Sequence, residues 1–268
     1  MDFITESGCK RESVLLQVQP RFADRRSWEL LVQEKNLFYE PLELSMGGHY
    51  SEDMLEWYRN SGRVRTIHGN FIDVNPASGD EDYRMLSQYK CHESCKLAKT
   101  LGADRVVFHS SIFPYLSGGY LENWVAVCAD FYSMLSEEYH MTICVENSMD
   151  LDPEPLYRLM KKMNGGIEWV CVCLDVGHAN YSRAGLDEWF DMLGEYIGHI
   201  HLSDNMGYFD DHLPLGQGTV DWPLVQKRWE QLNRKVPVTL EVGGIDGVKE
   251  SLAFLERNKY FGLGEKDV

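Results

Sequence analysis

The feature that most constrains the fold of this chain is a regular alternation of short β-type runs with helix-type runs. Eight β-type runs recur along 268 residues, or about one every 34 residues, which is the length that one strand and its following helix need. The runs are Val14–Gln19, Pro41–Leu44, Val64–Gly69, Arg105–Ser110, Thr142–Asn147, Trp169–Asp175, Gly198–Ser203 and Val238–Val242. Eight such units predict an α/β fold, a single (β/α)8 TIM barrel that occupies residues 1–268 as one domain.

The text between these runs has the periodicity of helices. Trp124, Cys128, Phe131 and Leu135 are spaced by four, three and four positions, which places them on one face of a helix. Asp221 precedes another apolar pattern and is expected to cap the helix there. Both patterns support helices that pack one apolar face against the strands.

An open, doubly wound sheet is the architectural alternative, because it also alternates strands with helices. Such a sheet usually carries a glycine-rich turn after its first strand, where a nucleotide phosphate binds. Here the first run ends in Gln19-Pro20-Arg21, without a glycine. The closed barrel is therefore the interpretation that we prefer.

Charge and cysteine content limit the classes of partner. The net charge of −16 would repel a polyanion in general, so nucleic acid is a disfavoured partner, although a bound metal ion would reverse the charge locally. Apolar runs such as Val170–Leu174 are far shorter than the ~20 residues that span a bilayer, so we expect no membrane partner. The seven cysteines and the absence of an apolar N-terminal segment predict a cytoplasmic protein with reduced thiols. Self-association as a homo-oligomer is left open.

Histidines and carboxylates stand at the ends of six successive β-type runs. Because the carboxyl ends of all barrel strands meet at one face, these side chains should converge on one pocket. They are His68, His109, Glu146, Asp175 with His178 three residues later, His201, and Glu241. Several carboxylates cannot share a small space as anions without a cation, and mixed histidine and carboxylate ligands suit transition metals better than calcium or magnesium. The sequence therefore predicts a divalent transition metal, with zinc, manganese, iron and cobalt as candidates and zinc or manganese preferred.

Other polar residues receive individual interpretations. Asp210 and His212 are two positions apart in a loop and add two metal-ligand types. His199 has the strand parity of His201 but lies deeper, so we expect it to support the site or to belong to the core. Cys171 and Cys173 alternate within one strand, as core residues do. The histidines expected to be solvated are His49, His92 and His140.

Short motifs around these residues give the chain a wider resemblance. They are Ile67–Phe71, Val107–His109, Val145–Asn147, Leu174–His178, His199–Asn205, Asp210–Gly218 and Leu240–Glu241. From about residue 12 to the end, the sequence resembles the xylose isomerase-like TIM-barrel superfamily, which includes sugar phosphate isomerases and epimerases as well as endonuclease IV. The motifs are specific for the superfamily and weakly specific for the substrate.

The resemblance to the epimerase-type branch implies a metal-dependent isomerase or epimerase of sugars or sugar phosphates. In that branch one metal is held by residues that match Glu146, Asp175, His201 and Glu241. The two glutamates also exchange protons with the carbon next to a carbonyl, and the histidine that matches His178 contacts the sugar. The segments His201–Asn205 and His212–Trp222 resemble this branch most closely, so a small carbohydrate is the expected substrate.

The resemblance to endonuclease IV implies a different activity, zinc-dependent hydrolysis of a phosphodiester at an abasic site. That branch uses three zinc ions and nine ligands, which match His68, His109, Glu146, Asp175, His178, His201, Asp210, His212 and Glu241. Phe71 matches an aromatic residue that lies at the DNA, but Asp211 stands where the nuclease pattern has an arginine. The expected number of ions is thus one to three, and the isomerase is preferred over the nuclease. A metal-binding barrel without turnover is the third alternative.

Overall fold

The fold is an eight-stranded parallel sheet rolled into a barrel. The computed structural model describes residues 14–45, 50–116, 119–163, 169–232 and 234–264. The strands are β1 (Leu16–Val18), β2 (Phe38–Tyr39), β3 (Thr66–His68), β4 (Arg105–His109), β5 (Thr142–Glu146), β6 (Val170–Asp175), β7 (Ile197–Leu202) and β8 (Val238–Leu240). They pair in the order β2-β1-β8-β7-β6-β5-β4-β3, and a parallel bridge between Tyr39 and Val64 joins the two ends of the sheet. The predicted (β/α)8 TIM barrel is confirmed.

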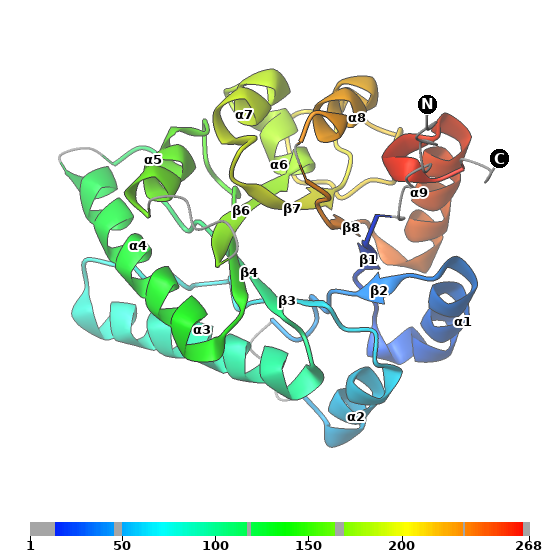
Figure 1. Ribbon diagram of the computed structural model, residues 1–268, viewed down its shortest axis with the longest axis horizontal. Coiled ribbons are helices and arrows are strands. Elements are labelled where there is room, and N and C mark those ends of the chain that lie inside the picture. Colours follow the sequence, from blue (N-terminus) through cyan, green and yellow to red (C-terminus); the bar gives the residue numbers. More distant parts are fainter. Residues whose placement is uncertain (1–13, 46–49, 117–118, 164–168, 233, 265–268) are drawn as a thin grey trace, which may run out of the picture.

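Helices surround the strands (Figure 1). They are α1 (Arg25–Lys35), α2 (Glu52–Ser61), α3 (Glu81–Leu101), α4 (Tyr120–Tyr139), α5 (Glu154–Lys162), α6 (Val176–Tyr181), α7 (Leu186–Leu193), α8 (Trp222–Glu230) and α9 (Gly244–Asn258), with 3-10 turns at Phe22–Asp24 and Tyr260–Gly262. The predicted stripe of α4 is buried, and the Asp221 carboxylate accepts a 3.0 Å hydrogen bond from the Leu224 amide at the start of α8. Both helix predictions are confirmed. None of the helices in the described ranges is long and apolar enough to cross a membrane.

The predicted second strand at Pro41–Leu44 is wrong. The strand is Phe38–Tyr39, and the chain turns directly after it. The Ser45 amide and hydroxyl both donate to the Leu42 carbonyl, at 2.9 and 2.7 Å, which closes a turn where the strand was expected. Pro41 has no N–H to offer to a neighbouring strand, so it favours the end of a strand over its middle.

The apolar residues form two separate clusters. The larger one lies between strands and helices, whereas the smaller one contains Val107, Cys144, Cys171 and Cys173. These four residues belong to adjacent strands and share the inward parity of His109, Glu146 and Asp175. The small cluster therefore fills the barrel interior on the side away from the carboxyl ends of the strands. Cys9 and His49 lie outside the described residues, and the cysteines within them are free and buried.

Candidate metal centre

The barrel brings together the side chains at its strand ends. One ligand atom each from Glu146, Asp175, His201 and Glu241 lies within 4.8 Å of the others. We call these four residues the four-residue centre. They come from β5, β6, β7 and the residue after β8, and Asp175 and His201 are direct neighbours in the strand register. Regular parallel pairing is therefore what places residues that are far apart in sequence at one point.

A second group shares a member with the first. His68, His109 and Glu146 also offer ligand atoms within 4.8 Å of one another. The Nε2 atoms of His68 and His109 both lie 3.6 Å from Glu146 Oε2. Glu146 therefore belongs to both groups: it contacts the two imidazole rings of His68 and His109 and is also part of the four-residue centre.

His178, Asp210 and His212 form a third arm of the cluster. Asp210 Oδ2 lies 3.2 Å from His178 Nε2 and 2.9 Å from His212 Nε2, and His178 Nδ1 lies 3.5 Å from Glu146 Oε1. His212 has a φ of 47°, in the left-handed region that non-glycine residues seldom adopt. All nine residues singled out from the sequence therefore lie in one connected cluster.

Three carboxylate oxygens of the four-residue centre are buried without a hydrogen-bond partner. They are Glu146 Oε2, Asp175 Oδ2 and Glu241 Oε2. Glu241 Oε2 lies 2.7 Å from His201 Nδ1, yet the two atoms are not aligned as a hydrogen bond. Buried oxygens with no donor are costly, and a cation between them would remove that cost. Three oxygens and one imidazole nitrogen are also a donor set that suits zinc or manganese. The residues present fit a divalent metal.

Backbone carbonyls orient three of the histidines. The Nδ1 atoms of His68, His178 and His212 lie 3.0, 2.7 and 2.8 Å from the carbonyl oxygens of Gly69, Asn147 and Glu241. Since a carbonyl can only accept, each Nδ1 carries a proton, and each Nε2 is turned toward the cluster. This arrangement is typical of histidines that bind metals.

The pKa values within the cluster reflect burial and crowding. Burial, reinforced by Glu146 and Glu241, raises the pKa of Asp175 to about 7. Burial lowers the pKa of His109 to about 4, so its imidazole is neutral at physiological pH. Burial also acts to raise the pKa of Glu146, but His201 and His109 outweigh it and hold that pKa well below its usual range. A bound cation would ionise Asp175 and would meet His109 in the neutral form that can bind it.

Glu40, directly after β2, is a buried residue of the site that the sequence analysis missed. Its Oε1 lies 2.9 Å from His201 Nε2 and its Oε2 lies 3.0 Å from His199 Nε2. Burial acts to raise the pKa of Glu40, but His201 and His199 outweigh it and keep that pKa well below its usual range. An available signal was Leu37–Glu40, an apolar run that ends in a carboxylate like the other strand ends. His199 is buried beneath the centre, as expected.

Comparisons with known proteins agree with this fold. A family model described as xylose isomerase-like TIM barrel matches residues 26–258. An uncharacterised protein of Methanocaldococcus jannaschii is 28% identical over 196 residues, which are 68% of this chain and 66% of that protein. A second uncharacterised protein of that organism is 26% identical over 183 residues, 68% of this chain and 72% of the relative.

Solved structures show the same fold at low sequence identity. A Thermus thermophilus protein from a crystal soaked with zinc chloride has a TM-score of 0.74 and 22% identity, over 95% of this chain and all of that one. A D-psicose 3-epimerase from Clostridium cellulolyticum, solved with D-tagatose, has a TM-score of 0.67 and 16% identity, over 92% of this chain and 96% of that one. At these identities the likeness concerns the fold alone.

Proposed function

The chain belongs to the xylose isomerase-like TIM-barrel family, and from that premise we propose that it is a metal-dependent isomerase or epimerase of sugars or sugar phosphates. One observation carries the proposal. Two glutamates, an aspartate and a histidine converge inside the barrel with three buried oxygens unpartnered. This arrangement combines ligands for a Lewis acid with two carboxylates that can exchange protons. Several structural neighbours are sugar epimerases, which agrees with a carbohydrate substrate.

In this proposal the four-residue centre holds the metal and also handles the proton. The bound metal would polarise a substrate carbonyl and so acidify the adjacent C–H bond. Glu146 ends β5 and Glu241 directly follows β8, and β6 and β7 lie between these two strands in the sheet, so in this proposal the two carboxylates approach the substrate from different sides. One of them removes the proton and the other returns it, to the opposite face of the carbon or to its neighbour. The first outcome gives an epimer, and the second interconverts a ketose and an aldose.

His178 orients the substrate in the same proposal. Its Nδ1 is held by the Asn147 carbonyl, and its Nε2 is turned toward Asp210 at the edge of the cluster. Burial acts to lower the pKa of His178, but Asp175, Asp210 and Glu146 raise it well above its usual value. A protonated imidazole there donates to a sugar hydroxyl or to the carbonyl oxygen. The metal is zinc or manganese in this proposal, and the cytoplasmic location stays a prediction.

Deuterium exchange tests the proposed chemistry. The metal-loaded protein is incubated in deuterated water with a panel of ketoses, inososes and their phosphates, and the substrates are followed by proton NMR. Proton transfer next to a carbonyl requires exchange at that carbon, even when the product equilibrium is unfavourable. We expect exchange in at least one compound, which disappears in the Glu146→Gln variant. No exchange across the panel would contradict the proposal.

The nuclease is the second candidate, and a specific observation favours it. The histidine pair His68 and His109 and the arm of His178, Asp210 and His212 give the cluster more ligands than one metal needs. Two observations favour the isomerase instead. Asp211 Oδ2 accepts a hydrogen bond from the Met206 amide at 3.2 Å and so orders its own loop with a negative charge, and the net charge is −16. Metal-dependent cleavage of a duplex with one abasic site, without exchange in any sugar, would reverse the order of the two candidates.

A further inference from the structure

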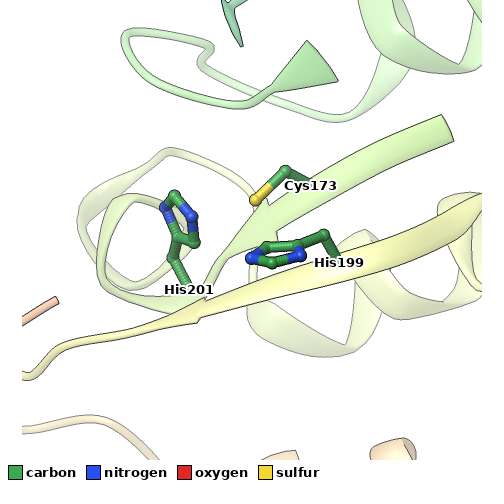
Figure 2. A group of neighbouring side chains, drawn as sticks. All are labelled: Cys173, His199 and His201. Carbon is green, nitrogen blue, oxygen red and sulfur yellow. The ribbon is translucent and has the colours of Figure 1, made fainter. Parts of the chain in front are cut away.

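Beneath the four-residue centre, the barrel interior contains a second set of polar side chains. Cys173 on β6 and His199 and His201 on β7 face one another there (Figure 2). One ligand atom from each lies within 4.8 Å of the others. The set is therefore either a second, sulfur-containing metal site or part of a hydrogen-bond network. The donors and acceptors of each ring decide between the two.

Arg105 fixes the proton of His199. Its Nη1 donates to the Gly198 carbonyl at 2.9 Å and lies 3.3 Å from His199 Nδ1. A guanidinium can only donate, so His199 Nδ1 accepts and the proton of the neutral ring is on Nε2. The Nε2–H group then points at Glu40 Oε2 and Thr239 Oγ1, both 3.0 Å away.

Glu40 in turn determines which ring nitrogen of His201 carries a proton. The Thr239 hydroxyl donates to Glu40 Oε2 at 2.6 Å, and His201 Nε2 lies 2.9 Å from Glu40 Oε1. A carboxylate held by these donors can only accept, so His201 carries a proton on Nε2. That leaves Nδ1 as the atom that faces the four-residue centre: it is hydrogen-bonded to Glu146 Oε1 at 3.2 Å, lies 2.7 Å from Glu241 Oε2, and would give up its proton to bind a metal.

We propose that Glu40 is a positioning residue that fixes His201 with its proton on Nε2 and its Nδ1 lone pair toward the metal, and that Arg105, His199 and Thr239 hold Glu40 in place. We call Arg105, His199, Thr239 and Glu40 the polar column. This inference rests on the proposed metal centre and adds a determinant of its metal affinity. The Nδ1 atoms of His68, His178 and His212 contact neutral backbone carbonyls. His201 Nε2 contacts the Glu40 carboxylate instead. A carboxylate partner makes the imidazole a stronger ligand than a carbonyl does.

A second metal between Cys173, His199 and His201 fits these contacts poorly. Both ring nitrogens of His199 and both oxygens of Glu40 already have partners, and the Arg105 guanidinium next to His199 would repel a cation. Among the buried side-chain atoms of the polar column, the one without a hydrogen-bond partner is Arg105 Nε, a donor that cannot bind a metal. The unpartnered carboxylate oxygens lie instead in the four-residue centre. The histidine and carboxylate atoms of the column are thus already used in hydrogen bonds and leave no lone pair aimed at a metal.

The Glu40→Gln variant tests the proposal. Glutamine keeps the volume but can present its amide N–H₂ to His201, which would leave Nε2 as an acceptor. We expect zinc affinity, measured by competition with a chelator, to fall by about 10- to 100-fold while circular dichroism is unchanged. In the zinc-loaded wild type, nitrogen NMR of labelled histidine should show His201 with zinc on Nδ1 and a proton on Nε2, and this pattern should be lost in the variant. A merely structural role of Glu40 would not move that signal.

Cys173→Ala is the matched control, because it removes the sulfur and leaves the polar column in place. We expect its zinc affinity to equal that of the wild type, and the cobalt-loaded wild type to lack a sulfur-to-cobalt charge-transfer band. A band that Cys173→Ala abolishes would overturn the proposal in favour of a sulfur-containing site. Unchanged zinc affinity in Glu40→Gln, or a His201 proton on Nδ1, would also overturn it without touching the proposed function. Zinc binding with the expected NMR pattern but no sugar exchange would contradict the proposed function alone.

Discussion

The four-residue centre and the polar column use the same types of side chain, one above the other in the same barrel. Both combine histidine with a buried carboxylate. His201 belongs to the four-residue centre, and its Nε2 contacts Glu40 of the polar column. In the column the carboxylate oxygens of Glu40 have donors, whereas in the centre three oxygens have none. The comparison teaches that residue type alone does not identify a metal site. What distinguishes the centre is the set of ligand atoms left without partners.

The largest effect should follow from neutralising the centre. Glu146→Gln and Glu241→Gln keep the side-chain volume but remove a proton carrier and an anionic ligand. We expect each to lower turnover by about 10²- to 10⁴-fold, with circular dichroism unchanged. Exposed Glu188 on α7 offers a matched control, and Glu188→Gln should retain full activity. Near-normal turnover in either of the first two variants would show that the carboxylates are not the proton carriers.

A metal-free protein should show the cost of the unpartnered oxygens as a pH dependence of stability. The pKa of Asp175 is raised from 3.8 to about 7 by burial first, and that of Asp150, a buried carboxyl outside the centre, from 3.8 to about 6. A raised carboxyl pKa means that the folded state binds the proton more tightly than the unfolded state. The contributions of these two carboxyls to the free energy of unfolding should therefore fall as pH rises from about 4, until about 6 for Asp150 and about 7 for Asp175. The pKa values of His109 and His199, which burial lowers from 6.5 to about 4, contribute in the opposite sense between about 4 and 6.5.

Two amide variants separate these contributions in chemical denaturation at a series of pH values. Relative to the wild type, Asp175→Asn and Asp150→Asn should each lack the fall in stability with pH that the replaced carboxyl contributes. For Asp150 that contribution is about 3 kcal/mol at most, since one pKa unit corresponds to about 1.4 kcal/mol. Only Asp175→Asn should weaken zinc binding. Equal losses of zinc affinity in the two variants would erase the distinction between the centre and the other buried carboxyls.

A smaller effect is expected from the column. Thr239→Val removes the hydroxyl that donates to Glu40 Oε2 and keeps the shape of the side chain. One hydrogen bond contributes about 1 kcal/mol, so zinc affinity should fall by roughly fivefold, less than in Glu40→Gln. Chelator competition on the two variants measures the ranking. A larger loss in Thr239→Val than in Glu40→Gln would mean that Glu40 is not the residue through which the column acts.

Much of the fold and the convergence of the site could be predicted from the sequence. Runs such as Val106–His109 and Ile143–Glu146 show both the strand and the polar side chain at its end. Parallel pairing of the strands then brings these side chains together at one end of the barrel. The predicted superfamily resemblance is confirmed by the family model. These features follow from local patterns, which the sequence displays directly.

The parts that sequence analysis missed depend on contacts rather than on patterns. Glu40 follows a strand of only two residues, which is too short to show an alternation. The strand was predicted at Pro41–Leu44, after Glu40. The ring orientations of His68 and His178 depend on where the Gly69 and Asn147 carbonyls lie. Such hydrogen bonds are set by packing after the strands have paired.

Metal content tests the central claim most directly. The protein is purified without chelator, analysed for transition metals, stripped, and then titrated with zinc and manganese by equilibrium dialysis, next to Glu146→Gln and Glu40→Gln. We predict at least one equivalent of a divalent transition metal in the wild type, a severe loss of affinity in Glu146→Gln and a partial loss in Glu40→Gln. Less than about a tenth of an equivalent, with no uptake on titration, would contradict the assignment of these buried histidines and carboxylates as a metal centre.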